Sequence, residues 1–232
     1  MSTEPIGLAR DLAPKGVMRA QIGHTDIAIW RSTNGVVSAW ENRCPHRGMR
    51  LSHGFVRGES LACAYHGWHY DCSGKCHYIP AHPELEPPST IRPSIYSVVE
   101  QAGILWVNTI ADADPVTLPK DLLSIRSITL ACDLPTAIDS FSSAAQTEVS
   151  LFNGSVSVFS QQPSILSLSS PDGADGIFIL FQQPYPHRVV AHVLANNLYQ
   201  ANDLIALSRW CESVRRAAEQ NTQSSNAPAS SL

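Results

Sequence analysis

Two short segments of the chain each combine one cysteine with one histidine. They are Cys44-Pro45-His46-Arg47-Gly48 and Cys63-Ala64-Tyr65-His66-Gly67. Thiolates and imidazoles bind zinc and iron–sulfur clusters, and proline and glycine are suited to tight loops whose backbone N–H groups approach sulfur. This spacing constrains the chain to a fold in which two loops meet at one metal centre.

Two kinds of metal centre take two cysteines and two histidines. Tetrahedral zinc does so, but a zinc finger normally places its two cysteines together and then its two histidines together. A Rieske [2Fe–2S] cluster takes two cysteines on one iron and two histidines on the other. Because each loop here carries one residue of each kind, the spacing favours the cluster, with zinc as the alternative.

The distribution of cysteines supports a metal site over a disulfide framework. Four of the six cysteines fall within 33 residues, and the first residues, MSTEPIGLARDLAPKG, have no apolar core of the secretory type. We therefore expect a cytoplasmic protein with reduced thiols. Cys72 and Cys76 bracket a hairpin tip; one buried and one partly exposed thiol is expected there, and a second metal site is the alternative.

Charge and hydropathy exclude two classes of partner. The net charge is −4 and the isoelectric point is about 6.1, so no broad nucleic-acid-binding surface is expected. No apolar run approaches the roughly 20 residues of a membrane span. We expect neither nucleic acid nor a membrane as partner.

The first 110 residues predict a small antiparallel β domain. Alternating or β-branched runs predict strands at 17–22, 26–32 and 35–40, with Asn34-Gly35 as a hairpin turn. Shorter strands are expected at 61–63, 68–71, 94–99 and 103–107. No long amphipathic helix is expected before residue 110.

The remainder predicts an α+β region, so the fold class is mainly β with a C-terminal α+β part. Residues 111–120 are expected to form a linker, with strands at 127–132, 147–152, 155–160, 176–184 and 188–196 and a turn at 170–176. The spacing of Leu204, Leu207, Trp210, Cys211 and Val214 predicts a helix over 203–219, capped by Asn202. We divide the chain into residues 1–112, 113–220 and a disordered tail at 221–232.

The sequence resembles the Rieske domain of ring-hydroxylating and O- or N-demethylating oxygenases. The similarity covers roughly residues 10–110 and rests on CPHRGMRLSHGFV, LACAYHGWHYDCSGKCHYIPA and VVEQAGILWVN. The Rieske proteins of the bc complexes carry two extra cysteines inside the ligand loops, which form a disulfide. Neither loop here has one, so the oxygenase type is indicated.

The resemblance implies a role for each candidate ligand. Cys44 and Cys63 would hold the inner iron, and His46 and His66 the outer iron, near the surface where electrons enter and leave. Oxygenase-type clusters are expected at the low end of a range of about −150 to +300 mV. Trp68 is expected to cover the cluster, with electron relay as the alternative. His69 is expected to be an ordinary strand histidine, with tuning of the cluster as the alternative.

The resemblance also implies a catalytic domain of the helix-grip type, which looks shortened here. In that family two histidines and a carboxylate hold a mononuclear iron. The 122 residues after Ile110 contain one His-x4-His pair, His187 and His192, on a predicted strand where the two side chains would point to opposite faces. We expect no mononuclear Fe(II) site, and we interpret the region as a reduced remnant of the helix-grip domain.

Three functions follow from these features. The first is an electron-transfer protein that accepts electrons from a flavin reductase or ferredoxin and passes them to a mononuclear-iron oxygenase subunit. The second is a small, complete terminal oxygenase that uses His187, His192 and Asp203. The third is a non-catalytic assembly or regulatory subunit.

We favour the first of these functions. The resemblance implies a homotrimer or a mixed trimer. Arg43, Arg47 and Arg50 are expected to form a docking patch for an acidic ferredoxin or a flavodoxin-like reductase, or simply to anchor the loop. The catalytic residues and the substrate of the oxygenase system cannot be assigned from the sequence.

Overall fold

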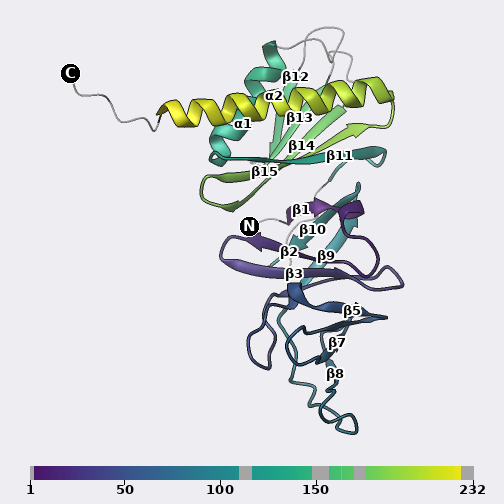
Figure 1. Ribbon diagram of the computed structural model, residues 1–232. Coiled ribbons are helices and arrows are strands. Elements are labelled where there is room, and N and C mark those ends of the chain that lie inside the picture. The colour runs from purple at the N-terminus through teal and green to yellow at the C-terminus, as the bar shows by residue number, and fades with distance from the viewer. Residues whose placement is uncertain (1–2, 110–116, 148–156, 163, 170–175, 226–232) are drawn as a thin grey trace, which may run out of the picture. The chain divides into compact units, whose positions relative to one another are not determined.

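The computed structural model describes residues 3–109, 117–147, 157–162, 164–169 and 176–225 (Figure 1). The chain divides into two compact units, Met1–Thr117 and Leu118–Leu232. Most of the ordered elements are strands, which confirms the predicted mainly β fold with a C-terminal α+β part. Within the described residues no helix is both long enough and apolar enough to cross a membrane.

The first unit contains two antiparallel sheets. The larger has the order β1-β10-β9-β4-β3-β2 and the smaller the order β5-β6-β7-β8. The strands of the larger sheet are β1 (Glu4–Leu8), β2 (Val17–Ile22), β3 (Thr25–Arg31), β4 (Val37–Glu41), β9 (Ile95–Gln101) and β10 (Ile104–Asn108). Those of the smaller sheet are β5 (Phe55–Arg57), β6 (Ser60–Ala62), β7 (His69–Asp71) and β8 (Cys76–Tyr78).

Alternating side chains account for the packing of the first unit. Ala28 and Trp30 of β3, with Trp40 of β4, are fully buried and contact the inward-facing Leu61 and Tyr70 of the smaller sheet. The Asn34-Gly35 turn is confirmed: Gly35 has a φ of 91°, and the Ser32 N–H donates to the Val36 carbonyl. The strands predicted around 17–40, 61–63, 68–71, 94–99 and 103–107 are all present within a few residues.

Three short strands of the first unit were not expected from the sequence, and neither was the strand Ile165–Ser169 of the second unit. β1, β5 and β8 are three to five residues long, which is too short for a clear alternating pattern. Each is stabilised by its neighbour, as β1 is by its antiparallel pairing with β10 from the other end of the unit. The pairing of β1 with a strand at the far end of the unit leaves no local signal in the sequence, and β5 and β8 are only three residues long.

The second unit is a five-stranded antiparallel sheet with two helices. Its strand order is β11-β15-β14-β13-β12. The strands are β11 (Leu122–Leu130), β12 (Ser157–Gln162), β13 (Ile165–Ser169), β14 (Gly176–Tyr185) and β15 (Arg188–Asn196), and the helices are α1 (Leu134–Thr147) and α2 (Ala201–Ser225). The strands predicted at 176–184 and 188–196 are confirmed as β14 and β15.

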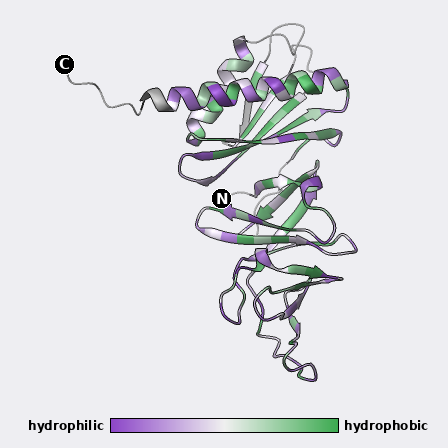
Figure 2. Ribbon diagram, in the orientation of Figure 1, coloured by the Kyte–Doolittle hydropathy of each residue, from purple (hydrophilic) through white to green (hydrophobic). Residues whose placement is uncertain are grey.

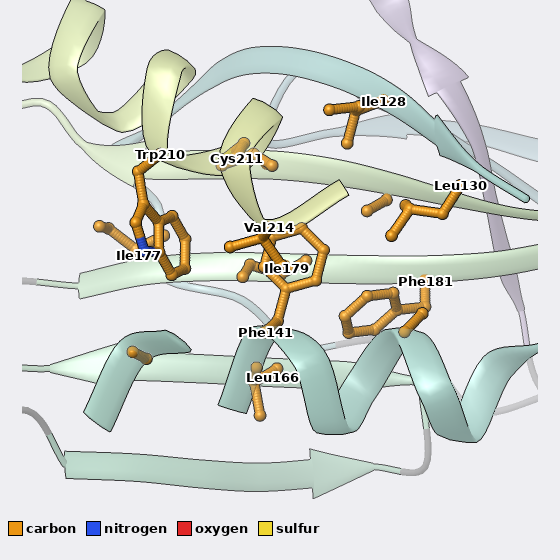
Figure 3. Packing of buried hydrophobic residues seen from close by; sticks show 14 of the residues in the cluster. Ile128, Leu130, Phe141, Leu166, Ile177, Ile179, Phe181, Trp210, Cys211 and Val214 are labelled. Atoms are coloured by element: carbon orange, nitrogen blue, oxygen red, sulfur yellow. The ribbon is translucent and has the colours of Figure 1, made fainter. Parts of the chain in front are cut away.

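One face of this sheet packs against both helices. Phe141 of α1 makes edge-on contacts with Phe181 of β14 and Trp210 of α2, each with ring centroids 5.6 Å apart. Figure 3 shows Trp210 and Val214 of α2 beside Ile177 and Ile179 of β14. These side chains form a single apolar core.

Helix α1 is not predicted by the sequence pattern. Its buried positions are Ala137, Phe141 and Ala145, so two of the three are small and give a weak hydrophobic pattern. Its serines are more typical of loops, yet the hydroxyls of Ser140 and Ser142 donate to carbonyls four residues earlier. The signal that could have found the helix is Asp133, whose carboxylate caps the Thr136 N–H at 2.9 Å.

Helix α2 is longer than predicted at both ends. Leu207, Trp210, Cys211 and Val214 are buried as expected, and hydrophobic and hydrophilic residues alternate along the helix (Figure 2). The expected Asn202 cap is wrong, because the helix begins at Ala201 and the Asp203 carboxylate instead accepts the Gln200 N–H. Residues 221–225 are helical and not part of a disordered tail.

Several predictions lie partly or wholly outside the described residues. They are residues 111–116 of the linker at 111–120, residues 148–152 of the strand at 147–152, residues 155–156 of the strand at 155–160, residues 170–175 of the turn at 170–176 and residues 226–232 of the tail at 221–232. The strand predicted at 127–132 overlaps β11, which begins at Leu122. The strand predicted at 155–160 overlaps β12, which begins at Ser157.

Candidate metal centre

The two Cys/His segments form loops beside the smaller sheet of the first unit. The first loop lies between β4 and β5, and the second connects β6 to β7. Residues 44 and 63 open the two loops, so the fold brings together segments that are separated by a complete hairpin. The backbone is arranged as expected for two loops that serve one site.

The two loops have the same hydrogen-bond pattern. In the first, the Cys44 N–H donates to the Met49 carbonyl and the Gly48 N–H donates to the Cys44 carbonyl, both at 2.8 Å. In the second, the Cys63 N–H donates to the Trp68 carbonyl at 2.9 Å and the Gly67 N–H to the Cys63 carbonyl at 3.0 Å. Each glycine is the fourth residue after its cysteine, so the glycines occupy equivalent positions in the two loops. The histidines do not, because His46 is the second residue after Cys44 and His66 the third after Cys63.

Gly48 and Gly67 are required by the backbone. Their φ angles are 73° and 67°, in the left-handed region that residues with a Cβ adopt at a cost. A Cβ at Gly67 would also lie 3.0 Å from Cγ of Pro80. The loop geometry is therefore encoded locally by the glycine positions.

The two thiols lie next to each other in the core. Cys44 and Cys63 are each 3% exposed. Burial raises the pKa of the Cys63 thiol, and the neighbouring Cys44 adds to this effect, while the backbone N–H groups of Tyr65 and His66 favour the thiolate. A buried thiol pair with N–H groups directed at sulfur favours binding of a cation, which removes the repulsion between two thiolates.

The two imidazoles form a second pair nearer the surface. The ring centroids of His46 and His66 are 4.7 Å apart, and Trp68 stacks on His46 at 4.1 Å with an interplanar angle of 7°. Desolvation lowers the pKa of His46, and the nearby charges of His66 and Arg47 lower it further. Both effects favour the neutral imidazole that can ligate a metal.

Tyr70 is a member of the site that the sequence did not reveal. It is fully buried on β7, and its hydroxyl lies 3.1 Å from Sγ of Cys44. When the sulfur is a thiolate, the hydroxyl is the donor. Burial raises the pKa of Tyr70, and the hydrogen bond to Cys44 raises it further. Its inward position on β7 follows from strand alternation, but its contact with Cys44 depends on the fold.

The donor set fits a [2Fe–2S] cluster with unlike irons. A buried thiol pair and a more exposed imidazole pair would each supply two ligands to one iron, and sulfides would complete both coordination shells. A zinc ion would need all four donors at one point. Among the residues that the structure describes, no three His, Cys, Asp or Glu side chains are placed around a single ion position. The arrangement favours the cluster over zinc.

The alternative iron ligands of the second unit have separate positions. His187 lies in the turn between β14 and β15, exposed and with a φ of 56°, so its assignment to a strand is wrong. His192 is buried on β15, and its Nδ1 lies 2.7 Å from Oγ of Ser127. The exposed turn position of His187 and the buried strand position of His192 thus differ in surroundings. Asp203 is engaged by the Gln200 N–H.

The remaining candidates near the loops have ordinary surroundings. Cys76 is buried and Cys72 is half-buried, as expected for two structural thiols. His69 makes edge-on contacts with His77 and Tyr78, at centroid distances of 6.0 and 5.2 Å.

Comparison with known proteins relates the first unit to a known domain family. Residues 2–92 match the family model of the Rieske [2Fe-2S] domain. The oxidoreductase NdmD of Pseudomonas putida is 38% identical over 127 residues, which are 53% of this chain and 21% of that protein. The 4beta-methylsterol monooxygenase of Methylococcus capsulatus is 41% identical over 118 residues, 47% of this chain and 31% of that protein. The chain thus spans between about a fifth and a third of the length of these curated relatives.

Solved structures extend the similarity to the whole chain. NdmA of Pseudomonas putida CBB5 superposes with a TM-score of 0.75 at 16% identity, covering 100% of this chain and 84% of that one. Dicamba monooxygenase bound to dicamba superposes with a TM-score of 0.73 at 17% identity, covering 100% of this chain and 91% of that one. At these identities the comparison establishes the fold alone, and it does so for both units.

Proposed function

Because the chain carries a Rieske [2Fe–2S] domain of the kind found in oxygenase components, we propose that it serves electron transfer in an aromatic-ring-hydroxylating or demethylating oxygenase system. In this proposal it accepts single electrons from a flavin reductase or a ferredoxin. It delivers them to a partner subunit that holds the mononuclear iron.

We assign Cys44 and Cys63 to the inner iron and His46 and His66 to the outer iron. When bound, such a cluster takes up and releases one electron at a time, at a potential raised by its neutral imidazole ligands relative to an all-cysteine cluster. The four side chains orient and hold it, and Tyr70 directs its hydroxyl at the Cys44 sulfur.

One observation carries this proposal: the thiols are buried while the imidazoles lie near the surface. Cys44 and Cys63 are each 3% exposed, whereas His66 is an exposed residue and Tyr65 beside it is 60% exposed. The imidazole edges therefore offer the shorter path to a partner protein. Trp68 packs flat on His46 and holds its ring in place.

We propose an assembly or docking role for the second unit. The space between its sheet and its helices is filled by apolar side chains such as Phe141, Phe181 and Trp210 (Figure 3). Its buried imidazole, His192, contacts Ser127. In this proposal the mononuclear iron and the substrate of the oxygenase system are held by the partner subunit.

The ligand assignment is tested by measuring the metal and sulfide content of the anaerobically purified protein. We expect about two irons and two acid-labile sulfides per chain, and a Rieske-type EPR signal after dithionite reduction. The Cys63→Ser variant should lose both iron and sulfide. The matched control Cys72→Ser, which removes a thiol outside the site, should keep both.

Other metal contents would redirect the assignment. Zinc without sulfide would contradict the cluster. A third iron without matching sulfide, lost on His192→Ala substitution, would support the terminal oxygenase instead. A cluster that cannot be reduced and reoxidised by one electron would contradict the electron-transfer role and favour a purely structural one.

A further inference from the structure

A surface depression of about 360 Å³ opens beside the first ligand loop. Its walls include His46 and three arginines, Arg43, Arg47 and Arg92. Arg43 and Arg47 come from the loop itself, whereas Arg92 comes from the connection between β8 and β9. The fold therefore gathers guanidinium groups from two distant segments around an imidazole of the metal centre.

These three arginines carry charges that the described part of the chain does not neutralise. All three are exposed, and none forms an ion pair with a described carboxylate. The nearest acidic wall residue, Glu41, accepts a hydrogen bond from the Ser94 hydroxyl at 3.1 Å. The depression thus presents an excess of positive charge in a chain whose net charge is −4.

Arg50, which the sequence suggested as part of this patch, is engaged elsewhere. It lies 3.4 Å from the carboxylate of Asp26, which also pairs with Arg19 at 2.7 Å. The free set is therefore Arg43, Arg47 and Arg92. Arg43 is held over the loop, since its Nε would lie 3.3 Å from a Cβ at Gly48.

We propose that Arg43, Arg47 and Arg92 form the docking site for carboxylate side chains on an acidic electron-donor protein, next to the imidazole edge of His46. This inference rests on the proposed electron-transfer function and names its donor by chemistry: an acidic iron–sulfur protein. Guanidinium forks bind carboxylates in bidentate fashion. A local positive patch on an acidic chain selects one orientation of an acidic partner during encounter.

The surroundings of the depression favour a protein over a small anion. Beside the other imidazole, Tyr65 is 60% exposed and tilts against His66 with ring centroids 3.9 Å apart. Exposed aromatic side chains beside charged residues are typical of protein interfaces. A partner seated on the arginines and on Tyr65 would cover both imidazoles, so one docked geometry would serve electron transfer.

The test compares two triple variants. In the first, Arg43, Arg47 and Arg92 are each replaced by glutamine. In the matched control, Lys120, Arg188 and Arg209 are replaced by glutamine; these are exposed residues of the second unit without a described ion pair, and their removal changes the net charge equally. Iron content and the EPR signal establish that each variant holds its cluster.

The probe is a reduced plant-type [2Fe–2S] ferredoxin, an acidic protein. One electron leaves the ferredoxin, which is oxidised, and reduces the present protein, with no transfer of atoms. Stopped-flow absorbance gives the second-order rate constant as a function of salt, and calorimetry gives the affinity for the oxidised ferredoxin. The cationic methyl viologen radical has no carboxylates and serves as a reductant that does not depend on a cationic docking site.

We expect the arginine variant to react with ferredoxin about tenfold or more slowly at low salt, with a flatter salt dependence and weaker binding. The control variant should behave like the wild type, and viologen should reduce the arginine variant at least as fast as the other two proteins, because removing positive charge does not slow a cationic reductant. An arginine variant with wild-type rate, salt dependence and affinity would overturn the docking inference alone. So would a wild type that viologen reduces but ferredoxin does not. A cluster-bearing wild type that neither reagent reduces would overturn the proposed function itself.

Discussion

At the scale of single residues, Tyr70 is the side chain whose contribution is most specific. It is fully buried, and its hydroxyl lies 3.1 Å from Sγ of Cys44, to which it donates when the sulfur is a thiolate. If Cys44 ligates the cluster as proposed, reduction would add negative charge to its sulfur and would strengthen this hydrogen bond. Hydrogen bonds to the sulfurs are one of the factors that set the potential of such clusters.

We expect Tyr70→Phe to lower the reduction potential by tens of millivolts. Loss of about 1.4 kcal/mol from the reduced state corresponds to about 59 mV for one electron. The phenyl ring preserves the packing, so iron content should not change. An EPR-monitored redox titration measures the shift, with Tyr96→Phe on β9 as the control. An unchanged potential would show that the bond contributes equally in both redox states.

Gly67→Ala should destabilise the first unit more than Gly58→Ala. Both glycines have positive φ, at 67° and 62°, so each substitution costs about 1–2 kcal/mol of backbone strain. Only at Gly67 would the new Cβ meet Pro80, at 3.0 Å; at Gly58 it would meet nothing within 4 Å. Urea unfolding gives both costs, and iron per chain should fall only for Gly67→Ala. Equal losses would contradict the steric argument.

At the scale of elements, α2 combines a buried apolar side with a charged outer side. Arg215 bonds Glu212 through Nη2 at 2.6 Å and Glu219 through Nη1 at 2.5 Å, and Arg216 bonds Glu212 at 3.2 Å. The hydrogen bond from Arg215, followed by that from Arg216, lowers the pKa of Glu212 to about 2, although desolvation opposes the shift. This network links successive turns of the helix.

We expect Glu212→Gln to lower the melting temperature at pH 7 and low salt. Because the folded-state pKa lies below the usual 4.5, the carboxylate stabilises the fold above pH 4.5, and this contribution is lost as the pH falls toward 2. The difference from wild type should therefore shrink between pH 4.5 and 2, and also in high salt. Thermal melts over this pH range measure it. A difference that persists at pH 2 would argue against the ion pairs as its source.

At the scale of the whole molecule, the apolar clusters follow the division into two units. One cluster draws all its residues from the second unit, around Phe141 and Trp210. The other two draw theirs from the first unit, one around the cysteines and Tyr70 and one around Ile27 and Leu105. Each unit therefore has a hydrophobic core of its own.

Phe141→Ala should weaken the second unit by about 3–5 kcal/mol and leave the metal centre intact. The substitution removes a fully buried ring that contacts Phe181 and Trp210. Calorimetry should show one thermal transition shifted downward, while iron, sulfide and the EPR signal stay at wild-type levels. Loss of the cluster in this variant would show that the two cores do not fold separately.

Several features of this protein follow from the sequence alone. Glycine four residues after each of Cys44 and Cys63 encodes two loops of the same geometry, because φ preferences act within a few residues. Strand alternation likewise predicts β2, β3, β14 and β15. The ligand motif, its two loops and most of the β architecture are therefore readable from short-range pattern and spacing.

The tertiary structure decided the features that depend on contacts between distant segments. It placed Tyr70 against the Cys44 sulfur and brought Arg92 beside Arg47, and neither contact follows from spacing along the chain. It also decided α1, where small alanines and serines carry little hydrophobic signal and the helix is held by packing onto the sheet. Local pattern predicts elements and loops, whereas the burial and charge of a site arise only when separate segments pack together.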